Sequence, residues 1–280
     1  MGSAMNIGWL SDIHLNFLDA LGRERFIETL SAKPVDAWLV SGDVGEAPSV
    51  VGYLSELAFG VTAPVYFVLG NHDFYGGSLR SVLAEVHSLS LSSDRLFWLT
   101  RSGPQFLAPG LSVVGDDGWA DGLLGNPFET PVELNDFRLI EELTGLSRSE
   151  LVKRLNRLGE DSAARLGPKL HDAAAECENV VVVTHVPPFE GAAWHEGRTS
   201  SPDWLPWFSA DAVGRTILEV ADRHHDTNFL VLCGHTHSPG QYSPIPNVVV
   251  HTAGASYGHP TVQGVIAFDG PSGTLSLRPG

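Results

Sequence analysis

Short apolar runs recur along most of the chain, and each is closed by glycine, proline, aspartate or histidine. Because the runs are too short for helices and rich in β-branched residues, they predict strands that are buried on both faces. Stretches with helical periodicity, such as 19–30 and 78–89, lie between the first four runs and have the length of crossover helices. The alternation predicts an α/β fold with a largely parallel sheet. The predicted strands span 5–10, 37–40, 65–69, 111–114, 180–183 and 229–232.

The pattern changes toward the C-terminal end of the chain. Apolar runs at 248–251, 262–268 and 274–277 follow one another closely, and turns rather than helices separate them. They predict antiparallel strands that close a second sheet. The stretch 187–209 is rich in proline, glycine and tryptophan and has no period, and a loop of this length in a compact domain is usually functional.

The middle of the chain has a different character. Leucines at helical spacing and many charged residues fill 132–178, so we interpret 120–178 as a cap-like helical insertion. No internal repeat or low-complexity linker divides the chain, which favours a single domain over 5–280. Residues 1–4 are small and uncharged and are interpreted as a cloning remnant.

Composition and charge narrow the possible partners. Of the 280 residues, 43% are hydrophobic and 18% are charged, which is typical of a globular protein. The formal net charge of −16 disfavours nucleic acid and anionic membranes as surface partners. No apolar run approaches the roughly 20 residues of a membrane span. The only cysteines, Cys177 and Cys233, form neither a metal motif nor a disulfide framework, so we expect a reducing, cytoplasmic environment.

Side chains that bind metals follow five of the predicted strands directly. Because ligands bind beyond the carboxyl ends of strands in open α/β sheets, these side chains are expected to meet at one place. Imidazole, carboxylate and carboxamide groups without thiolate suit manganese, iron, zinc, cobalt or nickel. The candidates outnumber the four ligands of a zinc site, so two metal ions are the simpler interpretation. The candidate ligands are Asp12, His14, Asp43, Asn71, His185, His235 and His237.

Each of these motifs has an ordinary structural explanation when it is taken alone. Gly42 and Asp43 are common turn formers, and Asn71 or Asp73 would suit the start of a helix. The sequence Gly-His-Thr-His at 234–237 is rarer by chance. The complete ordered set has no structural explanation of this kind, because histidines clustered at strand ends do not make a core.

The ordered motifs resemble those of the calcineurin-like metallophosphoesterase family, and they extend from residue 12 to residue 237. The resemblance implies a four-layer α/β/β/α sandwich, in which two mixed sheets are flanked by helices. It also implies a dinuclear centre in which Asp43 bridges two divalent metal ions. One metal would be held by Asp12, His14, Asp43 and His237, and the other by Asp43, Asn71, His185 and His235.

The resemblance also implies roles near the substrate. His72 would act as a proton donor or phosphate ligand, and Asp73 would orient it. Glu46 stands where purple acid phosphatases have a tyrosine ligand, and the arginine typical of phosphoprotein phosphatases is absent from this motif. Within the family, the chain therefore most resembles the broad bacterial class of phosphodiesterases and small phosphomonoesterases.

Two residues of the loop 187–209 are candidates for substrate contacts. Arg198 could bind a phosphate and Trp194 could stack on the substrate. The alternative is that the tryptophans of this loop anchor it to the body of the protein.

We therefore expect a metal-dependent phosphoesterase that hydrolyses a small-molecule phosphodiester or phosphomonoester. A metal-bridging hydroxide would attack the phosphorus in line, so no covalent nucleophile is needed. The alternatives are a non-catalytic metal-binding scaffold for protein partners and a nuclease. Retention of all seven candidate ligands with His72 argues against the scaffold, and the acidic surface argues against the nuclease.

Overall fold

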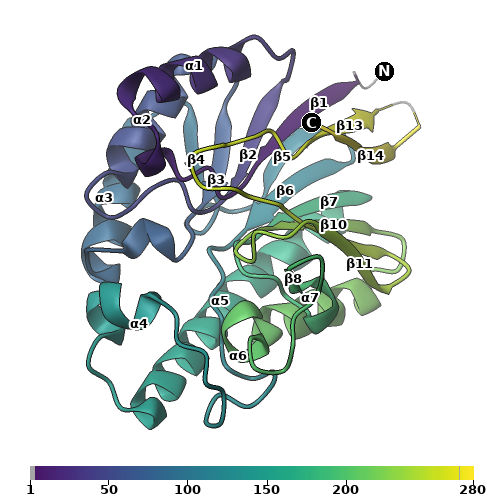
Figure 1. Cartoon of the computed structure of the whole chain (residues 1–280). Coiled ribbons are helices and arrows are strands. Elements are labelled where there is room, and N and C mark those ends of the chain that lie inside the picture. The colour runs from purple at the N-terminus through teal and green to yellow at the C-terminus, as the bar shows by residue number, and fades with distance from the viewer. Residues whose placement is uncertain (1–3, 271) are drawn as a thin grey trace.

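Two six-stranded mixed sheets form the centre of the protein (Figure 1). The computed structural model describes residues 4–270 and 272–280. The first sheet has the order β14-β13-β1-β2-β3-β4, and its strands β1 to β4 are parallel. Its strands are β1 (Met5–Leu10), β2 (Ala37–Ser41), β3 (Val65–Val68), β4 (Leu96–Trp98), β13 (Gly264–Asp269) and β14 (Thr274–Pro279).

The second sheet has the order β11-β12-β10-β7-β6-β5. The four strands β12, β10, β7 and β6 are parallel, and an antiparallel strand closes each edge. Its strands are β5 (Gln105–Ala108), β6 (Leu111–Gly115), β7 (Asn179–Val183), β10 (Asn228–Cys233), β11 (Gly240–Ile245) and β12 (Val248–Thr252).

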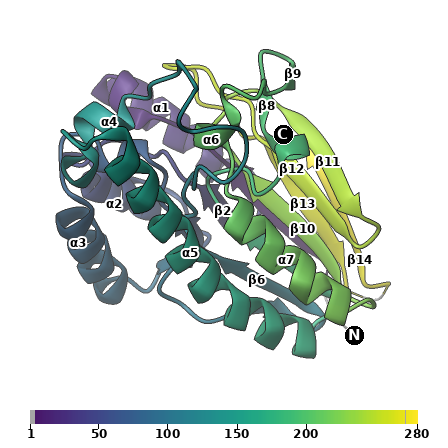
Figure 2. The same cartoon turned by 90° about the horizontal axis from the view of Figure 1, so that it is seen from below.

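An apolar core fills the space between the sheets, where Trp9 and Leu39 of the first pack with Val181 and Leu232 of the second. Helices α1 to α3 cover the outer face of the first sheet, and α5 and α7 run side by side over the second (Figure 2). This arrangement confirms the predicted four-layer α/β/β/α sandwich. The helices are α1 (Ala20–Ser31), α2 (Val50–Gly60), α3 (Leu79–Ser92), α4 (Asp136–Leu139), α5 (Arg148–Glu176), α6 (Leu205–Phe208) and α7 (Asp211–Arg223).

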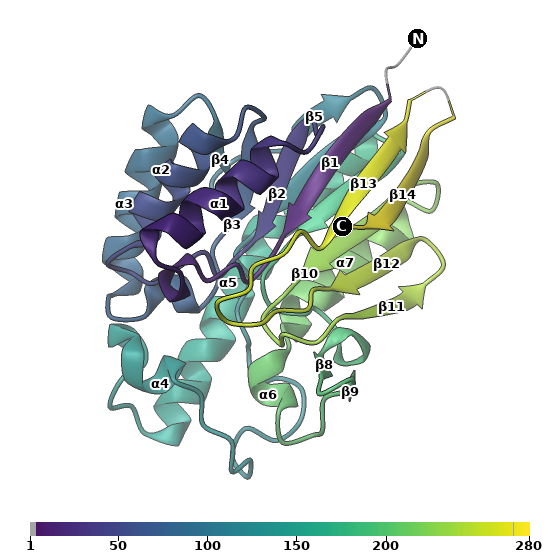
Figure 3. The same ribbon diagram turned by 45° about the horizontal axis from the view of Figure 1, so that its top comes forward.

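The C-terminal strands are divided between the two sheets, contrary to the prediction that they close the second one. Strand β13 pairs with β1 and β14 follows it in the first sheet, whereas β12 runs parallel to β10 in the second (Figure 3). The apolar pattern predicted that these segments are strands, but it contains no information on their pairing partner. Strands β4, β5 and β11 were not predicted, because they are short or contain glycine and proline.

The segment 120–178 divides into an irregular part and one long helix. A capping box at Ser147 and Glu150 starts α5, which is 29 residues long. The second half of α5 packs over the second sheet through Leu166 and Leu170, so it belongs to the outer helical layer. A cap-like role for this segment stays a prediction, as does the single-domain division. In the part of the chain that the structure describes, no helix is long and apolar enough to cross a membrane.

Candidate metal centre

The five predicted motifs meet at the carboxyl ends of five strands, three from the first sheet and two from the second (Figure 1). Residues after β1, β2 and β3 come together with residues after β7 and β10. Contacts across the sheets hold this edge closed. The backbone N–H of His235, after β10, donates to Asp12 Oδ1, after β1, at 2.9 Å, and the neighbouring Ser11 Oγ donates to the other oxygen of Asp12.

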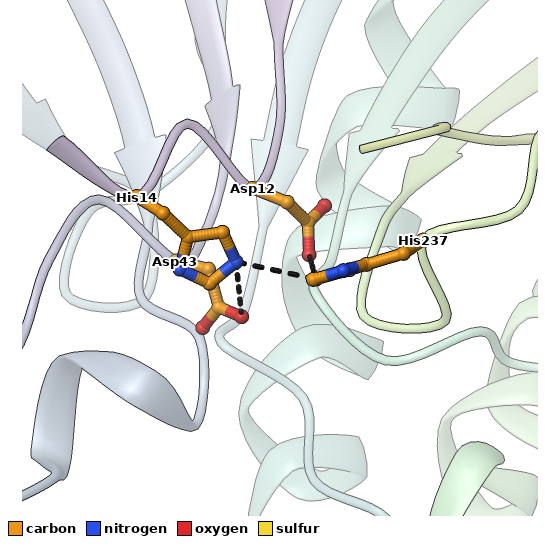
Figure 4. A group of neighbouring side chains, drawn as sticks. All are labelled: Asp12, His14, Asp43 and His237. Carbon is orange, nitrogen blue, oxygen red and sulfur yellow. Dashed lines mark hydrogen bonds and ion pairs between the residues drawn. The ribbon is translucent and has the colours of Figure 1, made fainter. Parts of the chain in front are cut away.

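One group of candidate ligands comprises Asp12, His14, Asp43 and His237 (Figure 4). Each offers one ligand atom, and these atoms all lie within 4.8 Å of one another. The Nε2 atoms of His14 and His237 are 3.2 Å apart. His237 Nε2 lies 3.4 Å from Asp12 Oδ1, and His14 Nε2 lies 3.7 Å from Asp43 Oδ2. Two imidazoles and two carboxylates therefore point into a space of atomic size.

A second group forms around the amide oxygen of Asn71. Asn71 Oδ1 lies 3.0 Å from His185 Nε2 and 2.9 Å from His235 Nδ1. Asp43 connects the two groups, because its Oδ1 lies 3.4 Å from His185 Nε2 while its Oδ2 faces His14. All seven predicted ligands are thus brought together, with Asp43 between them.

The hydrogen-bond partners of His185 and His235 indicate that the second group needs a positive charge at its centre. His185 Nδ1 faces the carbonyl oxygen of Ser41 at 2.8 Å, and His235 Nε2 faces that of Trp207 at 2.9 Å. Because a carbonyl only accepts, each of these nitrogens carries an N–H, which is the only N–H of the ring when the ring is neutral. In neutral rings the opposite nitrogens direct lone pairs at the Asn71 oxygen, and acceptors that face one another need a cation or a proton between them. Asp43 Oδ2 is also buried without a hydrogen-bond partner among the described residues, so this donor set fits a metal ion.

The pKa values of the metal-free chain agree with this interpretation. Burial opposes a charge on His185, but the negative charge of Asp43 and a hydrogen bond to it raise the His185 pKa to about 10. Burial lowers the pKa of His14 and of His235 to about 4, so both rings are neutral at pH 7. For Asp43, burial acts to raise the pKa, and the charges of His185 and His72 overcome it and hold the pKa well below its ordinary value. A proton on His185 thus takes the place of a cation.

Backbone strain is concentrated at the candidate ligands. Six non-glycine residues have a positive φ in the described part of the chain, and only Glu196 lies outside this group. A left-handed conformation costs such a residue about 1–2 kcal/mol and persists where the surroundings enforce it, typically at functional sites. The other five, with their φ angles, are Asp12 (50°), His14 (40°), Asp43 (55°), His235 (70°) and His237 (56°).

The glycines in the motifs make room for the ligands. A Cβ atom on Gly70 would overlap Asp43 Oδ1, and one on Gly234 would overlap Asp12 Oδ2. Each glycine therefore lets the backbone of one motif approach a carboxylate of another.

His72 and Asp73 occupy different environments. The His72 ring is half-buried, lies 4.7 Å from the His14 ring and stacks on Tyr75 at 4.2 Å between ring centroids. Asp73 is fully buried and accepts hydrogen bonds from the backbone N–H groups of Asp43, Val44, Gly45 and Gly70 at 2.8–3.1 Å. Asp73 thus holds two ligand-bearing loops together, and among the described residues no hydrogen bond joins it to the His72 ring.

A cleft of about 250 Å³ opens beside the second group. Asn71, His72, His235 and His237 line it, and in the described chain no lysine or arginine does. The other lining residues come from several separate segments of the chain and are Tyr75, Leu134, Asn135, Asp136, His195, Phe208, Thr236 and Tyr257.

The two predicted substrate residues lie away from this lining. Arg198 is exposed in a short hairpin formed by β8 (Trp194–His195) and β9 (Arg198–Thr199). The indole of Trp194 packs over Gly240 in β11, as an anchor of the loop would. His195, which the sequence did not single out for substrate contact, is the residue of this hairpin that reaches the cleft.

Asp136 is a further site residue that the sequence did not indicate. It is 6% exposed, and its Oδ2 accepts from Asn71 Nδ2 at 3.0 Å and from the Tyr75 hydroxyl at 2.6 Å. These contacts fix the Asn71 amide with its oxygen toward His185 and His235. Asp136 is 65 residues from Asn71 in sequence and follows no strand directly, so no local signal marks it.

Comparisons with known proteins agree with the geometry. Phosphopantetheinyl hydrolase from Mycobacterium tuberculosis has a similar fold, with a TM-score of 0.64 and 16% identity over 91% of both chains. A dimetal phosphatase from Danio rerio gives a TM-score of 0.57 and 16% identity over 98% of this chain and 96% of that one. At this level of sequence identity, the two comparisons show only that the folds are similar.

No match is found among curated proteins. A family model described as calcineurin-like phosphoesterase matches residues 5–239, which include every candidate ligand. The protein therefore belongs to the calcineurin-like metallophosphoesterase family of phosphoester hydrolases.

Proposed function

We propose that this protein is a dinuclear metal hydrolase that cleaves a small-molecule phosphodiester or phosphomonoester. The observation that carries this proposal is the position of Asp43, whose two oxygens face two separate groups of nitrogen and oxygen donors. Asp12, His14 and His237 would complete one metal site with Asp43. Asn71, His185 and His235 would complete the other.

The donor set suits divalent manganese, iron, zinc, cobalt or nickel. Such ions, when bound, would lower the pKa of bound water and polarise the phosphoryl oxygens. The chain contributes two carboxylates, Asp12 and Asp43, and otherwise neutral ligands, so a centre with two divalent ions is positively charged. This local charge allows a protein of net charge −16 to bind a phosphoester at one place.

His72 is placed to act on the leaving group. It follows Asn71 directly, its ring borders the cleft, and stacking on Tyr75 restricts the orientation of that ring. A half-buried imidazole can donate a proton to a departing alkoxide near neutral pH. We assign this role to His72. Asp73 then acts through the backbone of the loops rather than on the proton.

The cleft limits the substrate. Its volume of about 250 Å³ is that of a small molecule, and without lysine or arginine in its described lining, the phosphoryl charge depends on the metal centre. Both features, together with the acidic surface, disfavour a nuclease.

Hydrolysis assays test the proposal directly. Metal-free protein is loaded with each of the five metals and assayed on p-nitrophenyl phosphate, bis(p-nitrophenyl) phosphate and single-stranded DNA. We expect the wild-type protein to hydrolyse at least one of the two nitrophenyl esters. Asp43→Ala is expected to lose this activity. Asp94→Ala, which removes an exposed aspartate, is the matched control and is expected to retain it. Metal binding without hydrolysis of any ester would support the scaffold instead, and preference for DNA would support a nuclease.

A further inference from the structure

A second cavity, of about 290 Å³, lies outside the metal centre and shares no lining residue with the cleft. Its walls come from the start of α3, the turn after β4, the loop after β6 and one face of α5. The chain has 14 arginines in all. Four of them line this one cavity: Arg80, Arg101, Arg154 and Arg165.

Only one of these arginines is neutralised by an ion pair within the described chain. Arg165 forms a bidentate pair with the buried Asp116, at 2.7 and 2.9 Å. Arg101 stacks over Trp98 at 5.7 Å, which orders its side chain but does not neutralise it. Within residues 4–270 and 272–280, no carboxylate lies within ion-pair distance of Arg80, Arg101 or Arg154.

The carboxylates of the cavity are committed to other partners. Asp117 Oδ1 accepts from the Leu69 backbone, Trp98 Nε1 and Thr100 Oγ1 at 2.7–3.0 Å. Glu142 caps the start of α3, because it accepts the backbone N–H groups of Leu79 and Arg80.

The third carboxylate, Asp161, is exposed and lies 3.9 Å from Arg157 on the same helix. The lining carboxylates and Asp116 offset the formal charge of the four arginines, but within the described chain none of them pairs with Arg80, Arg101 or Arg154.

Arg154 supplies the second observation. Its Nε atom is buried and has no hydrogen-bond partner among the described residues. A buried donor of a charged group without a partner is costly, so native proteins normally provide one. A guanidinium group presents its N–H donors in a planar fork that matches the oxygens of phosphate.

We propose that this cavity is a second binding site, which holds the phosphate group of a small molecule through Arg154 with Arg80 and Arg101. The site is independent of the proposed hydrolysis, because it uses none of the candidate ligands. Its volume leaves room for an organic group beyond the phosphate. The ligand would be inorganic phosphate or a phosphorylated small molecule, which share this recognition.

Calorimetric titration of the metal-free full chain tests the site. Inorganic phosphate and glycerol 3-phosphate are titrated in separate arms into wild type, Arg154→Gln, Arg101→Gln and Arg223→Gln. Arg223 is exposed on α7 and pairs with Glu219, so its variant matches the change in charge outside the cavity. Tighter binding of the ester would identify a phosphorylated small molecule, and equal binding would identify the phosphate group alone.

We expect one saturable site, an affinity reduced about tenfold or more in Arg154→Gln, a smaller loss in Arg101→Gln and none in Arg223→Gln. Arg154→Lys keeps the charge and is expected to retain part of the affinity. If Arg154→Gln fails to fold, the affinity of Arg101→Gln is the test, because this side chain is exposed and its substitution is not expected to affect folding. No saturable binding at millimolar phosphate, or wild-type affinity in both cavity variants, would overturn the proposal.

Discussion

At the scale of single residues, the centre depends on which atom of Asn71 faces the histidines. The amide oxygen is selected because Asp136 and the Tyr75 hydroxyl engage the nitrogen on the other side. Groups that orient metal ligands in this way typically contribute about 10–100-fold to metal affinity.

Asp136→Ala is therefore expected to weaken metal binding about 10–100-fold without removing a ligand. Tyr75→Phe is the matched control and is expected to cost less, because Asp136 still accepts from Asn71. Competition with a chromophoric chelator measures both affinities. Unchanged affinity in Asp136→Ala would show that the amide orientation is set elsewhere.

His72 is expected to affect chemistry more than metal content. His72→Asn should keep both metals and lose about 10²–10⁴-fold in rate on an alkyl phosphoester, whose leaving group needs a proton. The loss on a p-nitrophenyl ester should be much smaller, because nitrophenolate is stable without one. Steady-state rates on the two esters measure this difference, and equal losses would contradict the role as proton donor.

The protonation of His185 predicts a pH dependence of metal binding. Because its pKa in the metal-free chain is raised to about 10, the ring is protonated at pH 7 and must lose that proton to bind a metal. Metal affinity is therefore expected to fall as pH is lowered from 8 to 6, about tenfold per unit for each proton released. Calorimetric titration of the metal in two buffers with different ionisation enthalpies counts the protons that are released on binding. If no proton is released, His185 is not a protonated ring that becomes a metal ligand.

At the scale of elements, the sequence was informative where the chain makes local contacts. Buried β-rich runs such as β7 and β10 follow directly from composition, and so does the placement of polar side chains at their carboxyl ends. The pairing of β13 with β1 does not, because an isolated strand pattern does not encode its neighbour. The left-handed backbone at five candidate ligands and the contact from Asp136 were likewise not predictable, since both are imposed by distant parts of the fold.

The glycines at the strand ends give a prediction on this scale. Gly70→Ala is expected to destabilise the protein by about 1–3 kcal/mol, because the new Cβ would overlap Asp43. Gly52→Ala is the control: nothing lies within 4 Å of its Cβ in the exposed first turn of α2, so a gain of at most about 0.5–1 kcal/mol is expected. Denaturant unfolding of the metal-free proteins compares the two, and equal effects would contradict the packing argument.

At the scale of the whole molecule, the sandwich joins two half-sites. The first sheet carries Asp12, His14, Asp43 and Asn71, and the second carries His185, His235 and His237. Neither sheet alone supplies a complete set of ligands for either proposed metal. The metal centre therefore depends on the packing of the two sheets, and Asp43 is the residue on which both proposed sites depend.

The most direct test of this account counts metal ions per chain in protein saturated with manganese. We expect two ions in wild type and in the exposed control Asp94→Asn, and weakened binding at both sites in Asp43→Asn, because one carboxylate faces both groups. Elemental analysis after equilibrium dialysis over a range of free manganese concentrations gives both the number of ions bound per chain and their affinities. A single ion in saturated wild type, or two ions at wild-type affinity in Asp43→Asn, would contradict the dinuclear centre.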